Sequence, residues 1–227
     1  MVFENLKILE ERILAKCNSC KRERSEIRLI GVSKTKPIDL IKEAVKAGIK
    51  DFGENKAQEL RDKSELINGD FNWHFIGHLQ SNKIKYVIKN AEYIHSVDSI
   101  KLAEEINVSA SRNNKIQNVL LEIKTSDEAT KFGLAEEKEI MDTAEFCMKA
   151  ENLKLAGLMT MAPFTDNENE IRKSFKNLYE LKLKMNEQGF GLTELSMGMT
   201  SDFEIAIEEG STMLRIGTAI FGGRNYN

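Results

Sequence analysis

Proline, cysteine and long apolar runs are scarce in this chain. Of its 227 residues, 2 are proline and 3 are cysteine. Apolar residues never continue for the roughly 18 positions that a membrane helix needs, so we predict no transmembrane segment. Residues 1–6 lack a basic stretch followed by an apolar core, and we therefore expect no secretory signal.

The three cysteines form no recognisable site in the sequence. Their odd number argues against a disulfide framework, and the close pair, Cys17 and Cys20, ends a predicted helix instead of following a strand as redox pairs do. Cys147 and three scattered histidines are poorly spaced for a zinc site. We expect reduced thiols in a cytoplasmic protein, with any role of Cys17 and Cys20 left open.

Neither sign of charge is in large excess. The net charge is −3, with 33 basic and 36 acidic residues interleaved along the chain. This balance lacks the basic field that recruits nucleic acid, and interleaved charges are typical of solvated helix surfaces. With 41% hydrophobic residues, the chain can bury a full core. We therefore predict a globular protein without nucleic-acid or membrane partners.

Strand-like and helical segments alternate along almost the whole chain. Eight such units joined by mostly short loops predict an α/β fold, a single (β/α)8 barrel of the TIM type. We place the barrel at residues 28–221 of one domain, 1–227, with an extra N-terminal helix within residues 1–24. An open doubly wound sheet is the alternative, but it requires a glycine-rich phosphate loop after the first strand, and none is present. The predicted strands are residues 28–34, 50–53, 72–77, 92–97, 118–124, 153–159, 192–197 and 213–216, and the predicted helices are 2–20, 38–47, 56–67, 82–89, 99–112, 135–149, 167–187 and 201–209.

Local patterns give further expectations. Ser201 and Glu204 match a capping box that begins the last predicted helix. His74 lies inside a strand and is expected to be a hydrogen-bonded core histidine, while Met159 and Met161 are expected to serve packing. The N-terminal helix should pack on the barrel through one apolar side, formed by Phe3, Leu6, Leu9 and Ile13.

A lysine follows the apolar run of the first strand. Alternation places Ile30, Val32 and Lys34 on one face, and if that face points into the barrel, Lys34 stands at the mouth where barrel enzymes keep their chemistry. A desolvated lysine beside another cation loses its proton more easily and becomes a nucleophile for carbonyl groups. The alternative is a surface lysine before a turn, which the nearby Pro37 favours.

Two loops rich in small residues follow the last two strands, at residues 196–201 and 217–219. Barrels often bind phosphate there through backbone amides, hydroxyls and a helix N-terminus. Gly198 and Gly217 could instead only form turns. Arg215 precedes the second loop and can point into the mouth, or form a structural salt bridge. A lysine nucleophile, an arginine and a phosphate site together suit a phosphorylated cofactor that carries a carbonyl group.

A series of short motifs makes the chain resemble a known family over nearly its whole length. That family is the pyridoxal-phosphate homeostasis proteins, which share the barrel of the alanine racemase N-terminal domain. Each motif is short, but so many in the same order are highly specific. The motifs are residues 32–37 (VSKTKP), 52–55 (FGEN), 74–83 (HFIGHLQSNK), 131–133 (KFG), 157–159 (GLM), 196–199 (SMGM) and 215–222 (RIGTAIFG).

The resemblance implies that the cofactor is pyridoxal 5'-phosphate (PLP), bound covalently as a Schiff base on Lys34. It implies that Arg215 faces the pyridine nitrogen and that Gly217, Thr218 and the region of Thr200 hold the phosphate. The matched motifs also include Ser196 and Asn55 among the expected cofactor-binding residues. We expect no catalytic residue and no metal ligand.

Several matched positions stay open between two interpretations. Family members more often have serine then aspartate where this chain has Thr200 and Ser201, so either hydroxyl could contact the phosphate. Asn55, with Gln58 three positions on, also reads as an ordinary helix cap. His78 and Gln80 could edge the pocket or be solvated loop residues. Lys36 and Lys131 could each provide a second PLP or phosphate site, or Lys131 could simply face water.

Two functions fit the resemblance. The first is a monomeric carrier that buffers PLP, maintains vitamin B6 and amino-acid homeostasis without turnover, and passes PLP to PLP-dependent apo-enzymes. The alternative is a PLP-dependent amino-acid racemase. In alanine racemases a second base comes from a C-terminal β-domain, whereas here about 11 residues follow the eighth strand, with Tyr226 the one tyrosine among them. A phosphosugar enzyme with a Schiff-base lysine also suits the barrel but lacks the motifs.

Overall fold

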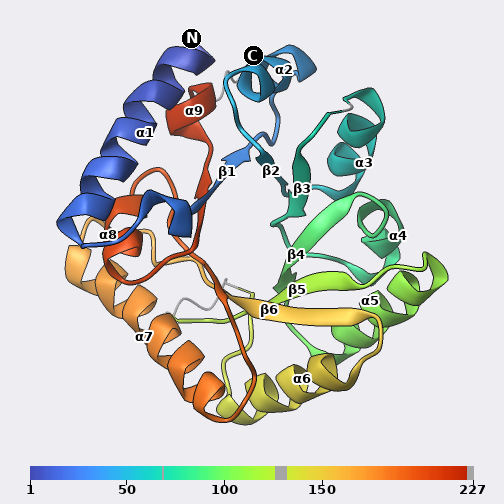
Figure 1. Cartoon of the computed structure of the whole chain (residues 1–227). Helices are drawn as coiled ribbons and strands as arrows, with labels where there is room; N and C mark the ends of the chain where they lie inside the picture. Colours follow the sequence, from blue (N-terminus) through green and yellow to red (C-terminus); the bar gives the residue numbers. More distant parts are fainter. Residues whose placement is uncertain (68, 126–131, 224–227) are drawn as a thin grey trace.

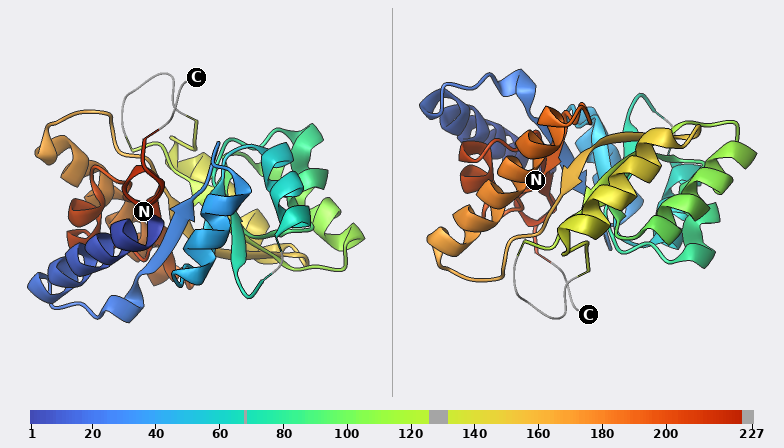
Figure 2. Two further views of the ribbon diagram at one scale, coloured as in Figure 1. Left: turned by 90° about the horizontal axis from the view of Figure 1, so that it is seen from above. Right: turned by 90° about the horizontal axis from the view of Figure 1, so that it is seen from below.

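Eight parallel strands close into one ring, which confirms the predicted (β/α)8 barrel. The computed structural model describes residues 1–67, 69–125 and 132–223, and the strands pair in chain order from β1 to β8, with β8 returning to β1. Figure 1 shows the strands in the middle and the helices around them, and Figure 2 shows the same arrangement from above and below. The strands are β1 (Arg28–Val32), β2 (Asp51–Glu54), β3 (Asn72–Phe75), β4 (Ala91–Val97), β5 (Gln117–Glu122), β6 (Leu153–Met159), β7 (Glu194–Ser196) and β8 (Met213–Ile216).

The helices form the outer layer. Within the described residues two short 3₁₀ segments accompany them, η1 (Arg24–Glu26) and η2 (Ser81–Lys83). The α-helices are α1 (Val2–Ser19), α2 (Ile38–Lys46), α3 (Ala57–Leu66), α4 (Ile84–Val87), α5 (Ile100–Arg112), α6 (Glu137–Lys149), α7 (Glu168–Glu187), α8 (Phe203–Glu208) and α9 (Thr218–Phe221).

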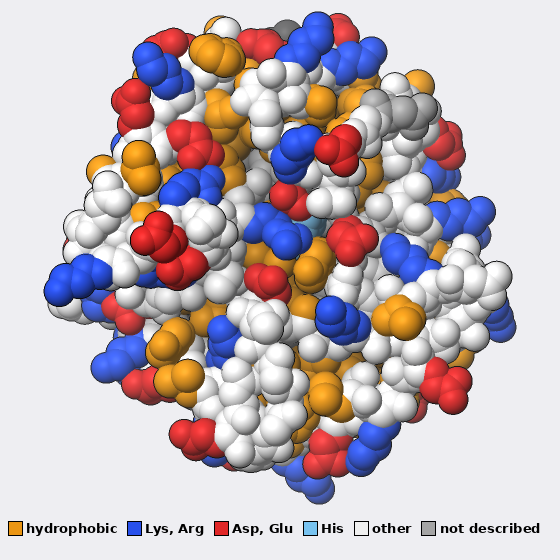
Figure 3. Space-filling model, viewed as in Figure 1, with side chains coloured by type: hydrophobic (Ala, Val, Ile, Leu, Met, Phe, Trp, Pro, Cys, Tyr) orange, Lys and Arg blue, Asp and Glu red, His pale blue; other side chains and the backbone are white. Residues whose placement is uncertain are grey.

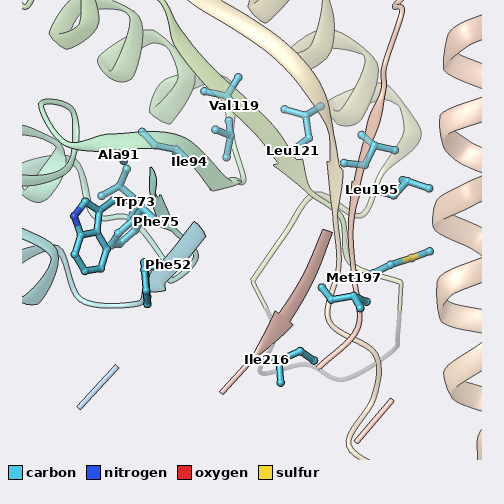
Figure 4. Close-up of a cluster of buried hydrophobic side chains, with 14 of the residues drawn as sticks. Phe52, Trp73, Phe75, Ala91, Ile94, Val119, Leu121, Leu195, Met197 and Ile216 are labelled. Atoms are coloured by element: carbon cyan, nitrogen blue, oxygen red, sulfur yellow. The ribbon is translucent and has the colours of Figure 1, made fainter. Parts of the chain in front are cut away.

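Side chains of each strand alternate between two apolar regions. The larger one lies between the ring of strands and the helices, and Figure 4 shows part of it, including Phe52, Trp73 and Leu195. The smaller one fills the barrel interior, where Met159 is buried and Met161 is half-buried, as expected for packing residues. Because both faces of a parallel barrel strand are covered, β1 and β6 read as nearly continuous apolar runs, whereas other strands also bury polar side chains.

The N-terminal helix packs on the barrel with a different face from the predicted one. Its buried side contains Val2, Leu6, Leu9, Ile13 and Cys17, whereas Phe3 is 63% exposed. Positions 2, 6, 9, 13 and 17 follow the helical repeat of 3.6 residues, and the residue after Val2 is rotated by about 100° away from that stripe. The prediction was therefore right for three residues and wrong for Phe3.

The last helices also depart from the sequence-based expectation. The residue that precedes α8 is Asp202, which shows that the capping box assigned to Ser201 is wrong. The Asp202 carboxylate instead accepts a hydrogen bond from the backbone N–H of Met199 at 2.5 Å, across the preceding loop. The short helix α9 was not predicted at all, because its four residues, which begin at Thr218, are too few to show a period.

The surface matches the composition. In the view of Figure 3, Lys and Arg side chains mix with Asp and Glu side chains around the middle of the face, so no single sign of charge dominates there. No helix in the described ranges is long and apolar enough to cross a bilayer.

Cys17, Cys20 and Cys147 are free thiols, and burial raises the pKa of Cys147 to about 12.

Candidate functional site

The turn after β1 carries Lys34. The strand ends at Val32, two residues earlier than predicted, and Lys34 lies half-buried in a turn at the carboxyl end of the barrel. Two hydrogen bonds from side chains of α3 hold this turn on either side of the lysine. Lys63 Nζ donates to the carbonyl of Ser33 at 2.7 Å, and the backbone N–H of Thr35 donates to Glu59 Oε1 at 2.6 Å.

Thr35 needs this support because its backbone adopts φ +62°. A threonine rarely occupies the left-handed region, since its branched side chain crowds the backbone there. The Thr35–Glu59 bond fixes the residue immediately after Lys34, so the direction of the lysine side chain depends on α3.

A buried ion pair lies behind the turn. Lys63 Nζ is 2.7 Å from Glu54 Oε1 and 2.7 Å from Glu59 Oε1, and the Ser33 hydroxyl donates to Glu54 Oε1 at 2.7 Å. Burial raises the pKa of Glu54, and the neighbouring Lys63 ammonium opposes that rise. Sequence reasoning missed Glu59 and Lys63. The available signal was that Lys63 falls on the buried stripe of its helix with Ala57 and Leu60.

We predict that Lys63→Met destabilises the protein by about 3–5 kcal/mol, because Glu54 would be left as a buried carboxylate without its cation. Urea unfolding monitored by circular dichroism gives the free energy of unfolding. The double variant with Glu54→Gln should recover part of the loss. Lys56→Met, an exposed change next to the same helix, is the matched control and should stay within about 0.5 kcal/mol of the native protein. An unchanged free energy of unfolding in Lys63→Met would contradict a stabilising role of the ion pair between Lys63 and Glu54.

Lys36 connects the β1 turn to the end of α9. Its Nζ donates to the carbonyls of Phe221, Gly222 and Gly223 at 3.2, 2.9 and 2.8 Å. The ammonium group therefore satisfies carbonyl groups at the helix C-terminus, where cations are favoured. In this structure Lys36 is a link between two loops of the mouth.

The loops after β7 and β8 meet at the same mouth. A Cβ atom added to Gly217 would lie 3.3 Å from the carbonyl of Val32, so the backbone after β8 passes close to the end of β1. Thr200 is half-buried, and its hydroxyl accepts a long hydrogen bond, 3.4 Å, from the backbone N–H of Ala219 in α9. Ser201 is exposed. Of the two hydroxyls, that of Thr200 is therefore placed at the first turn of α9, which begins at Thr218.

Arg215 lies in the barrel interior with 5% of its surface exposed. Its Nη1 donates to the Ser196 hydroxyl at 2.6 Å and its Nη2 to the carbonyl of Thr160 at 2.9 Å. No carboxylate in the described part of the chain forms an ion pair with it, which argues against the structural salt bridge. Burial lowers the pKa of Arg215 to about 10, and the charges of Asp202 and Glu122 oppose that fall.

Glu122 is a buried acid at the end of β5. Burial raises its pKa to about 7, the charge of Asp98 raises it further, and Arg215 has the opposite effect. The folded state therefore holds this proton more tightly than the unfolded chain does. Glu122 contributes stability that is fully present below its ordinary pKa of 4.5 and is lost as the pH rises to about 7.

We predict that Glu122→Gln flattens the loss of stability between pH 5 and pH 8, because an amide cannot ionise. Relative to the native protein, the variant should gain on the order of 2 kcal/mol over that interval. Urea unfolding at several pH values measures this difference. Glu168→Gln, at an exposed position, should keep the native pH profile. A gain that is the same at pH 5 and pH 8 would show that ionisation of Glu122 is not its cause.

The remaining candidates have mixed outcomes. His74 is a hydrogen-bonded core histidine, as predicted, with Asp51 Oδ1 2.9 Å from its Nε2. Asn55 does not cap α3, because Lys56 precedes that helix and no side chain caps it. A Cβ atom on Gly77 would lie 2.3 Å from the carbonyl of Asn55, so only a glycine permits this approach of the two loops.

The rim of the mouth carries the histidine that was left open. His78 Nδ1 is 3.2 Å from Asp98 Oδ2, and its ring stacks on Phe132 with centroids 3.8 Å apart. Gln80 is exposed and precedes η2. The expectations for Lys131 and Tyr226 fall outside the described residues. Lys34, Thr200, Gly217 and Thr218 all follow the carboxyl ends of their strands, β1, β7 and β8, whereas Arg215 and its partner Ser196 lie within β8 and β7.

Comparison with known proteins identifies close relatives. The alanine racemase N-terminal domain family matches residues 10–225. The pyridoxal phosphate homeostasis protein of Aquifex aeolicus is 42% identical over 225 residues, covering 98% of each chain. The protein of the same name from Pseudomonas aeruginosa is 40% identical over 226 residues, covering 99% of this chain and 96% of the relative.

Solved structures share the fold. PipY of Synechococcus elongatus, determined with PLP bound, superposes with a TM-score of 0.87 at 31% identity, covering 98% of this chain and 100% of PipY. An alanine racemase of Clostridium difficile has a TM-score of 0.76 at 18% identity, covering 96% of this chain and 57% of the racemase. The likeness to the racemase is one of fold alone.

Proposed function

Because the chain belongs to the pyridoxal phosphate homeostasis protein family, built on the alanine racemase N-terminal domain, we propose that it binds PLP at the mouth of its barrel. In this proposal it carries and buffers the cofactor, serves vitamin B6 and amino-acid homeostasis, and catalyses no turnover. In the same proposal the protein is a monomer and delivers PLP to PLP-dependent apo-enzymes.

The observation that carries the proposal is a buried guanidinium without a carboxylate partner among the described residues, at a mouth that also holds a half-buried lysine. A guanidinium only donates hydrogen bonds, so Arg215 suits an acceptor such as the pyridine nitrogen of PLP. The amine of Lys34 suits the aldehyde, with which it forms a Schiff base. The Ser196 hydroxyl accepts a hydrogen bond from the guanidinium, and Asn55 directly follows the carboxyl end of β2.

The phosphate would occupy the loops after β7 and β8. Gly217 exposes its backbone there, Thr218 begins α9, and the hydroxyl of Thr200 lies at the first turn of that helix. Backbone amides and hydroxyl groups are the donors that phosphate sites in barrels use. The residues present therefore fit both ends of the cofactor.

A carrier is favoured over a racemase. PLP supplies an electron sink when its ring nitrogen is protonated, and a cationic arginine facing that nitrogen disfavours protonation, which limits carbanion chemistry in the carrier and in the racemase alike. The relatives from Aquifex aeolicus and Pseudomonas aeruginosa match over almost their whole length and have the homeostasis name, whereas the likeness to alanine racemase covers 57% of that enzyme and concerns its fold alone.

Lys34 should carry the covalent cofactor. A PLP-loaded preparation should show a visible absorption band that borohydride bleaches, and peptide mapping should then locate the pyridoxyl group on Lys34. Lys36→Ala is the matched control and should keep the label on Lys34. A label mainly on another lysine of the native protein would overturn the assignment. Sustained conversion of L- to D-alanine, lost in Lys34→Ala, would favour the racemase instead.

Gly217→Val should weaken PLP binding without unfolding the barrel, because its Cβ would lie 3.3 Å from the carbonyl of Val32 and the loop would shift its backbone amides away from the phosphate. Thr200→Ala should cost less, about 1.5–3 kcal/mol for one charge-assisted hydrogen bond. Fluorescence titration with PLP and with pyridoxal measures both effects. Equal affinity of the native protein for the two ligands would argue against any phosphate site.

A further inference from the structure

Five side chains from five strands hydrogen bond in series across the barrel interior. The chain begins at Asp51 of β2, passes through His74 of β3, His95 of β4 and Ser196 of β7, and ends at Arg215 of β8. The successive distances are 2.9 Å from Asp51 Oδ1 to His74 Nε2, 2.9 Å from His74 Nδ1 to His95 Nε2, 2.8 Å from His95 Nδ1 to Ser196 Oγ, and 2.6 Å from Ser196 Oγ to Arg215 Nη1.

The first end of the chain is an acceptor. Burial raises the pKa of Asp51, but the hydrogen bond that His74 donates, together with Asn72 and the charge of Arg28, contributes to a pKa that is lowered overall. Asp51 is therefore a carboxylate and can only accept. His74 is fully buried, and burial lowers its pKa, so it is neutral and carries one proton. That proton must be on Nε2, where it is donated to Asp51.

The remaining links follow one after another. With its proton on Nε2, His74 presents a bare Nδ1, so His95 must donate from its own Nε2. Burial lowers the pKa of His95 well below its ordinary value, and it is neutral as well. Its Nδ1 is then an acceptor, and the Ser196 hydroxyl donates to it. The lone pairs of Ser196 remain for Arg215, which can only donate.

All hydrogen bonds of the chain therefore point the same way, from Arg215 to Asp51. Without His95, the Ser196 hydroxyl could rotate and turn its proton toward the guanidinium. With His95 present, Ser196 is fixed as an acceptor and holds Nη1, while the Thr160 carbonyl holds Nη2. Both terminal nitrogens of Arg215 thus have a hydrogen-bond acceptor, which fixes the plane of the guanidinium.

We infer that Ser196, His95 and His74 are positioning residues, and that their one-way chain holds Arg215 and keeps the barrel interior from passing a proton to the ring nitrogen of the cofactor. The role toward the cofactor rests on the proposed function, whereas the series of hydrogen bonds rests on the structure. A proton can move toward Arg215 only if every hydrogen bond of the chain reverses. The two buried histidines therefore cannot strengthen the electron sink of the cofactor.

The direction of the chain can be tested without PLP. Nitrogen-15 NMR of histidine-labelled protein at pH 7 should show both buried histidines, His74 and His95, as neutral rings with the proton on Nε2. The protein has 3 histidines, and the exposed His78 serves as the reference signal. A proton on Nδ1 of His95, or a charged ring at either buried position, would overturn the inference.

The positioning role is tested by Ser196→Ala, which removes the link between His95 and Arg215. We expect a PLP dissociation constant about tenfold higher and a mixture of tautomers at His95. Ser211→Ala is the matched control, since Ser211 is also fully buried but its hydroxyl donates to the backbone carbonyls of Leu195, Met197 and Met213. It should change the dissociation constant less than twofold and leave the tautomers unchanged.

A second pair of variants covers the case in which Ser196→Ala does not fold. His95→Gln can accept from Ser196 and donate to His74, so it should bind PLP nearly as the native protein does, whereas His95→Leu should bind about tenfold more weakly. Equal affinity in each matched pair would refute the positioning role while native PLP binding still supports the proposed function. Native protein that binds no PLP but shows the expected tautomers would refute the function and leave the chain's direction intact.

Discussion

A guanidinium group buried inside the barrel is the constraint on which the polar structure of this protein depends. Arg215 is 5% exposed, and taking a cation out of water without a direct counter-ion is costly. Its hydrogen bonds to Ser196 and to the Thr160 carbonyl replace part of its hydration. The charges of Asp202 and Glu122 act on it from further away. Buried charged groups with strongly shifted pKa values cluster at functional sites.

The charges of Lys63 and Arg215, the two buried cations near the mouth, are compensated in different ways. Lys63 pairs directly with Glu54 and Glu59, so its charge is neutralised within one cluster behind β1 and β2. The charge of Arg215 has no such partner among the described residues, and a series of neutral groups connects it to Asp51. As a result, the turn that carries Lys34 is anchored to helix α3, and Arg215 is anchored to the strands.

The errors of the sequence-based analysis share a cause. Phe3 and Val2 are neighbours, and both suit an apolar stripe until the helix is placed against the barrel. Asn55 was left open between a cap and a cofactor contact; it does not cap α3, and its backbone instead lies close to Gly77. Asp202 replaces Ser201 before α8, and its carboxylate turns back to Met199. In the two wrong assignments, neighbouring residues are equally suitable by type, and only their contacts in the folded protein distinguish them.

The sequence by itself determined the barrel, the place of Lys34 near the carboxyl end of the first strand and the place of Arg215 in the eighth, because side-chain periods of 2 and 3.6 can be read within a short window. Only the tertiary structure decided what these residues touch. His95 and Ser196 are 101 positions apart, and they meet because the closed ring brings β4 and β7 to opposite sides of one interior. Hydrogen bonds across that interior depend on which strands face each other, and no local pattern contains this information.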